Sequence, residues 1–183
     1  MYSIRNIIDE EMKDYQFIHN IFLDSCGFDP SDQIEQDASF KILEWAEQDV
    51  VSLILSDSVL EEIRNFNTPS WIQEIAGRFV ITLRTDLTPE EQIRKKAIEA
   101  VVIGTGQDAN HKQDALHIFM ADKWGKYFIT TDNRLLKRRE RIKQVSTGLM
   151  ICKPIEFINI VMNDLKFQKL HKVKMEMLKR KTN

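Results

Sequence analysis

Residues Gln113 to Arg138, QDALHIFMADKWGKYFITTDNRLLKR, decide the fold of this chain. Apolar residues recur with helical spacing from Ala115 to Met120, and Gly125 stands where such a helix would end. The run Tyr127–Ile129 is aromatic and β-branched, which predicts a strand buried on both faces. The stretch therefore predicts a helix, a tight turn, a buried strand and the start of a second helix.

Two aspartates bracket this unit. Asp114 lies where the first helix is expected to begin, and Asp132 lies just beyond the carboxyl end of the strand. In open α/β sheets, ligands bind at the carboxyl ends of the strands. We therefore expect both carboxylates to lie at one edge of a sheet.

Short strands and helices alternate along the rest of the chain. Thr88-Pro89-Glu90-Glu91 is a clear helix start, because it supplies a cap, a proline at the first position and acids at the positive end of the dipole. The alternation predicts an α/β fold with a central, mostly parallel sheet flanked by helices. Strands are expected at 17–23, 50–55, 79–83 and 145–151, and helices at 38–48, 56–66, 70–75, 88–102 and from Lys153-Pro154 onward.

The length of 183 residues suits one domain with short additions at its ends. We expect an acid-rich extension at 1–16, the main domain at 17–163 and a basic tail at 164–183. Apolar residues interleave with the lysines of the tail, which predicts a basic amphipathic helix. The tail lacks Trp, so we expect it to contact RNA or a protein partner rather than a membrane.

The composition is that of an ordinary globular protein, with 43% hydrophobic and 30% charged residues. A formal net charge of −2 neither predicts nor excludes nucleic acid as a partner. Cys26 and Cys152 have no CxxC spacing, which favours two buried thiols in a reducing compartment. The sequence has no signal-peptide pattern and no apolar run of about 18 residues, so we expect a cytoplasmic protein.

Four acids share a similar placement on the expected elements. Converging carboxylates repel one another, so they persist together when a divalent cation neutralises them. Oxygen ligands suit Mg²⁺ or Mn²⁺, which also accept phosphate oxygens, activate water and stabilise charge in phosphoryl displacement. The four are Asp24 after the first strand, Glu62 in an early helix, Asp114 and Asp132.

These blocks resemble the PIN domain family, named for the PilT N-terminus, which includes the VapC-type toxin ribonucleases. The matching blocks are IFLDS with Asp24, SDSVLEEI with Glu62, DALHIFMA with Asp114, and FITTDNRLL with Thr130, Asp132 and Asn133. The resemblance covers roughly residues 21–161 and implies a PIN-like three-layer fold. It implies a metal-dependent ribonuclease whose four acids hold Mg²⁺ or Mn²⁺, with the hydroxyl of Thr130 ordering the site. It also favours a homodimer.

Two points depart from the compact pattern of the family. Glu61 competes with Glu62 as the helix acid, and we choose Glu62 because it precedes Ile63, as the family's glutamate precedes leucine or isoleucine. Both chain ends lie outside the pattern, so the substrate and any antitoxin or other protein partner do not follow from it.

Basic residues follow directly after the acids. Asn133 and Arg134 are candidates for orienting water or gripping phosphate, although Asn is equally an ordinary helix cap. Lys137 and Arg138 continue this run of basic residues. Such a run usually forms a solvated helix face, but its position beside the acids favours a role at an RNA backbone. His117 shares the helix face of Asp114, and we expect it to be packed rather than a ligand.

The sequence thus favours a metal-dependent endoribonuclease, with the toxin of a toxin–antitoxin or defence system as one cellular role. The alternative is a non-catalytic RNA-binding or scaffold module of the same fold. Phosphatase chemistry of the haloacid-dehalogenase type is discounted, because it needs a second aspartate two residues after the first, where this chain has Cys26.

Overall fold

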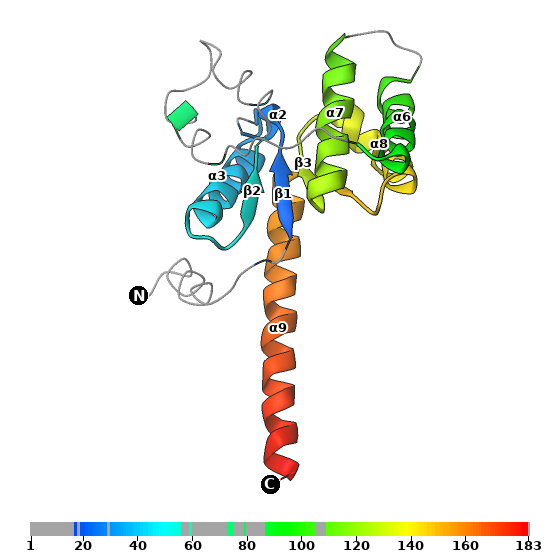
Figure 1. Cartoon of the computed structure of the whole chain (residues 1–183). Helices are drawn as coiled ribbons and strands as arrows, with labels where there is room; N and C mark the ends of the chain where they lie inside the picture. The colour runs from blue at the N-terminus through cyan, green and yellow to red at the C-terminus, as the bar shows by residue number, and fades with distance from the viewer. Residues whose placement is uncertain are drawn as a thin grey trace.

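The computed structural model describes Phe17, 19–28, 30–55, Val59, 73–74, Phe79, 87–104 and 109–182, with the side chains of 109–110, 173 and 175–182 excepted. Its centre is a four-stranded, all-parallel sheet in the order β2-β1-β3-β4, flanked by helices (Figure 1). The expected α/β class is therefore confirmed. The strands are β1 (Asn20–Leu23), β2 (Ser52–Ile54), β3 (Tyr127–Ile129) and β4 (Met150–Cys152).

Alternate residues of the strands face two separate cores. Ile21 and Tyr127 pack with one cluster, whereas their neighbours Phe22 and Phe128 pack with the other. This period of two is the geometry of a pleated strand. Because helices cover both faces of the sheet, the buried residues of the strands form continuous hydrophobic runs in the sequence.

Two groups of helices cover the two faces of the sheet. The first face carries α3 (Gln33–Glu47) and the start of α9 (Pro154–Thr182), and the second carries α6 (Pro89–Ile103), α7 (Ala109–Trp124) and α8 (Asn133–Val145). The short helix α2 (Ser25–Phe28) follows β1 directly. Figure 1 shows α9 running out of the body of the molecule, so that its C-terminal end lies far from the sheet.

The central stretch folds as its sequence predicts. Helix α7 ends at Trp124, and Gly125 makes the turn into β3. A Cβ at Gly125 would lie 2.9 Å from two ring carbons of Phe22, so this close approach of helix end and strand requires glycine. The turn therefore fixes α7 and β3 in the orientation that brings their acids to one edge.

Several boundaries differ from the expected ones. Helix α3 begins at Gln33 rather than near 38, because the side chain of Asp32 caps it by accepting from the amides of Ile34 and Glu35. Strands β1, β2 and β4 are shorter than expected, and Val145 ends helix α8 instead of opening a strand. The elements expected at 56–66, 70–75 and 79–83 lie mainly outside the described residues.

The basic tail is continuous with the main domain as far as its backbone is described. Helix α9 runs unbroken from Pro154 to Thr182, so the boundary expected between 163 and 164 falls inside a helix. Within the part of the chain that the structure describes, none of the helices combines the length and apolar content needed to cross a membrane.

Candidate active site

Asp24 lies at the carboxyl end of β1 and is almost completely buried, with 7% of its surface exposed. Its backbone amide donates to the carbonyl of Ile129 at 3.0 Å, which continues the ladder between β1 and β3. Its carboxylate accepts from the hydroxyl of Thr130 at 2.8 Å, the thiol of Cys26 at 3.1 Å and the amide of Ser25 at 3.0 Å. These three donors satisfy a carboxylate that burial alone would make costly.

Cys26 belongs to this network as a thiol. Burial, and then the charge of Asp24, raise the pKa of Cys26 from 9.0 to about 11. The side chain therefore stays protonated at neutral pH and donates to Asp24, while its sulfur lies 3.1 Å from the hydroxyl oxygen of Thr130. Sequence analysis did not identify Cys26 as part of the site; its position two residues after Asp24 was the available signal.

Thr130 connects two of the acids. It follows β3 and is fully buried. Its hydroxyl donates to Asp24 Oδ2 and accepts from the backbone amide of Asp132 at 3.0 Å. One hydroxyl thus holds the end of β1 against the loop after β3.

Asp132 is the N-cap of α8, and Asn133 is the first residue of that helix. One carboxylate oxygen, Oδ1, accepts from the backbone amide of Arg134 at 2.7 Å. The other oxygen, Oδ2, lies 3.1 Å from the guanidinium of the same arginine. The capping interpretation considered for Asn133 therefore belongs to its neighbour Asp132, and Asn133 is exposed.

Asp114 lies in the second turn of α7, rather than at its beginning as expected, because α7 starts at Ala109. Burial raises the pKa of the Asp114 carboxyl, and the charges of Asp24 and Asp132 raise it further against the opposing effect of Arg134. The charges of Asp24 and Asp132 thus act on Asp114, as expected for acids at one edge of the sheet.

Arg134 lies between two of these acids. One guanidinium nitrogen, Nη2, bonds both Asp114 Oδ2 and Asp132 Oδ2, and the side chain is 26% exposed. Burial alone would lower the pKa of Arg134, but its bonds with the two carboxylates outweigh burial and raise it. Arg134 is a sequence candidate for orienting water or gripping phosphate, and in this structure its guanidinium pairs with two of the acids and balances their charge.

The remaining candidates separate into three groups. Lys137 is exposed on α8, whereas Arg138 is half-buried and donates to the carbonyl of Val102 at the end of α6. His117 is buried, as expected. Glu62 and its competitor Glu61 lie outside the described residues. The structure thus brings together Asp24, Asp114, Thr130, Asp132 and Arg134.

The chemistry of the donor set suits a hard divalent cation. Asp24, Asp114 and Asp132 offer carboxylate oxygens, which Mg²⁺ and Mn²⁺ prefer, and the Arg134 guanidinium is a stand-in cation between two of them. Among the described side chains, no three His, Cys, Asp or Glu groups already stand in an arrangement that could hold a metal ion. A metal would therefore require these side chains to rearrange or to be joined by a further ligand.

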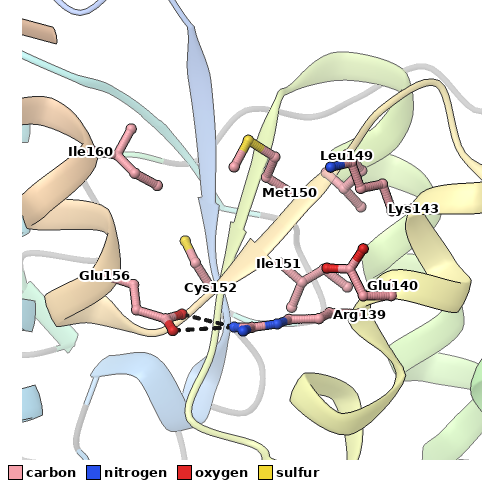
Figure 2. Close-up of a pocket in the computed structure, with 9 residues that line it drawn as sticks. All are labelled: Arg139, Glu140, Lys143, Leu149, Met150, Ile151, Cys152, Glu156 and Ile160. Carbon is pink, nitrogen blue, oxygen red and sulfur yellow. Dashed lines mark hydrogen bonds and ion pairs between the residues drawn. The ribbon is translucent and has the colours of Figure 1, made fainter. Parts of the chain in front are cut away.

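A pocket of about 320 Å³ lies elsewhere, between α8, β4 and the start of α9 (Figure 2). Its walls include Lys143, Ile151 and Ile160, and the ion pair between Arg139 and Glu156 spans it at 3.1 Å. None of the three aspartates lines this pocket. The concave surface at the edge of β4 is therefore distinct from the acidic site.

Comparison of the chain with protein-family models gives no match, and comparison with curated proteins gives none either.

Proposed function

We propose that this chain is a metal-dependent endoribonuclease with a PIN-like three-layer fold. The observation that carries the proposal is the hydrogen-bond network through Thr130 and Arg134, which links Asp24 and Asp132, the acids after β1 and β3, with Asp114 of α7. The carboxyl edge of a parallel sheet is where ligands of such folds bind. An acid whose pKa is raised by burial and by acidic neighbours, as that of Asp114 is, is more typical of a functional site than of a purely structural one.

Asp24, Asp114 and Asp132, joined by Glu62 from the resemblance, would hold Mg²⁺ or Mn²⁺. Such a cation supplies water activation and stabilises the charge that develops on a phosphodiester. Thr130 keeps the carboxylate of Asp24 and the amide of Asp132 in fixed positions through its two hydrogen bonds. Asp132 itself is held by its bond to the first turn of α8, which limits the motion of the site.

RNA is the proposed substrate because basic side chains lie on the helix that begins at this site. Lys137, Arg141 and Lys143 are exposed on α8, and Arg134 stands at its first turn. Lysine and arginine side chains supply the sequence-independent contacts to phosphates that dominate binding of nucleic acids. A toxin role would add a protein antitoxin that blocks this surface.

Cleavage of labelled single-stranded RNA tests the proposal. Wild-type protein should cleave with Mg²⁺ or Mn²⁺ and lose activity in EDTA. Asp114→Asn should reduce cleavage at least about a hundredfold, because it removes a charged ligand while keeping the shape of the side chain. Asp37→Asn, which changes an exposed acid on α3, is the matched control and should cleave as wild type does. Full activity of Asp114→Asn would contradict the assignment.

The second candidate is a non-catalytic RNA-binding module. The two ion pairs of Arg134 favour it, because they give Asp114 and Asp132 a structural role that needs no metal. RNA binding that is indifferent to EDTA, without cleavage by wild-type protein, would support this alternative over the ribonuclease.

A further inference from the structure

Arg134 uses the carboxylate oxygens that a divalent cation would need. Its Nη2 bonds Oδ2 of Asp114 and Oδ2 of Asp132. The other oxygen of Asp132, Oδ1, accepts from the backbone amide of Arg134 and so caps α8. Oδ2 is therefore the oxygen of Asp132 that is not used by the helix cap, and Arg134 bonds it.

From this shared oxygen we infer that Arg134 is an internal counter-ion that competes with the divalent cation, and that metal binding releases its guanidinium. The inference rests on the proposed function. Two cations on one carboxylate oxygen repel each other, so the arginine and the metal exclude each other at Asp114 and Asp132.

The charge balance explains why a divalent ion would displace the arginine. Three carboxylates interact at this edge, whereas Arg134 contributes one positive charge and bonds two of them. A negative surplus thus remains when Arg134 is in place, and an ion with twice its charge compensates it better. The guanidinium reduces the repulsion between the acids but does not neutralise all of their negative charge.

A second acceptor is ready for the released side chain. Arg134 Nη1 lies 3.5 Å from the carbonyl oxygen of Val102, which belongs to the last turn of α6. The last carbonyls of a helix have no partner within the helix and attract cations. The guanidinium therefore keeps a hydrogen-bond acceptor beside the acids when its bonds to them are lost.

Arg138 provides a matched control on the same helix. It lies one turn after Arg134 and donates to the same carbonyl of Val102. Its described bonds are to this carbonyl and not to an aspartate. Replacing it removes the same charge from the same region and leaves the competition for Asp114 and Asp132 intact.

Calorimetric titration of the full chain with Mn²⁺ and with Mg²⁺ tests the inference. Arg134→Gln should bind Mn²⁺ about tenfold more tightly than wild type, which corresponds to the loss of two charge-assisted bonds of partly exposed groups. Arg138→Gln should stay within about twofold of wild type, because only long-range charge is lost. In wild-type protein, Mg²⁺ should shift the NMR signal of the Arg134 side-chain Nε–H and leave that of Arg138 in place.

The outcomes separate the inference from the proposed function. Equal Mn²⁺ affinity of the two glutamine variants, or an Arg134 signal that ignores Mg²⁺, overturns the competition and leaves the ribonuclease proposal standing. Absence of metal binding by both wild type and Arg134→Gln overturns both. If Arg134→Gln does not fold, Arg134→Lys takes its place, since one ammonium cannot bridge both acids as the guanidinium does, and an affinity about threefold above wild type is expected.

Discussion

Thr130 is the residue on which the geometry of the site depends most directly. Its single hydroxyl serves as donor to the buried carboxylate of Asp24 and as acceptor for the amide of Asp132. Thr130→Val keeps the shape but leaves both partners without this bond. We expect the free energy of unfolding to fall by about 1–3 kcal/mol, measured by urea denaturation, because unsatisfied buried polar groups cost that much.

Thr130→Ser is the control for this change. It keeps the hydroxyl and loses one buried methyl group, so a cost of about 1 kcal/mol is expected from lost burial. If valine is tolerated better than serine, the methyl contact matters more at this position than the two hydrogen bonds.

At the residue scale, the sequence predicts the acids better than it predicts their partners. Asp24 and Asp132 follow short apolar runs, and the change from apolar to polar residues marks the end of a buried strand in the sequence. The contact of Arg134 with Asp114 has no such signal. It depends on how α8 packs against α6 and α7, which no local spacing encodes.

At the scale of elements, Glu156 ties the start of α9 to α8. Its carboxylate accepts from the backbone amide of Lys153, the residue before the helix, at 2.9 Å, and pairs with Arg139 at 3.1 Å (Figure 2). Burial would raise the pKa of Glu156, but these partners outweigh it and lower the pKa from its ordinary value of 4.5. The ionised carboxylate thus stabilises the folded state.

Glu156→Gln should therefore destabilise the protein in a pH-dependent way. A depressed pKa contributes stability above the unfolded value of 4.5, and that contribution is lost as pH falls through the folded pKa. At pH 7 the variant should lose about 1 kcal/mol or less, because the pair is partly exposed. Thermal melts from pH 7 to pH 3 should show the gap to wild type closing.

Glu140→Gln is the control, because Glu140 lines the same pocket and is exposed. It should show no comparable gap at pH 7. A gap that persists unchanged at pH 3 for Glu156→Gln would mean that packing of the side chain, rather than its charge, holds α9.

The elements that the sequence predicts best carry their own start signals. Helix α6 begins at Pro89 with a complete capping box between Thr88 and Glu91, as its sequence indicates. The start expected for helix α3, near residue 38, is later than the observed start at Gln33. The residues before its apolar face give no periodic signal, and only the Asp32 cap marks its beginning. Where apolar spacing and caps disagree, the cap locates the helix end more accurately.

The whole molecule divides into a packed body and a projecting helix (Figure 1). Helix α9 buries Phe157, Val161 and Leu165 in the core that it shares with α3 and one face of the sheet, at the regular spacing of one helix face. Beyond Leu165 the described side chains of α9 are exposed, and Phe167 and Leu170 are 70% and 76% exposed. The buried face of the helix therefore ends at Leu165, although apolar residues continue beyond it.

This division predicts that α9 contributes to stability through residues up to Leu165, and to binding through the residues beyond it. Removal of 167–183 should change the free energy of unfolding by no more than about 0.5 kcal/mol, because the described side chains in this range are exposed and exposed residues contribute little. A truncation that also removes Leu165, which is 4% exposed, should cost about 2–5 kcal/mol, since it deletes a buried leucine from the core. Urea denaturation of the two truncated proteins measures both values.

The same truncation tests why the helix carries its lysines. Lys166, Lys169 and Lys172 are exposed beside Phe167 and Leu170, an arrangement that suits phosphates together with an apolar contact. If this surface holds RNA, the protein lacking 167–183 should bind single-stranded RNA about threefold to tenfold more weakly, with a smaller dependence on salt concentration, because fewer counterions are released. Unchanged RNA affinity with unchanged stability would show that residues 167–183 serve neither the fold nor RNA binding, and would leave a protein partner as their remaining role.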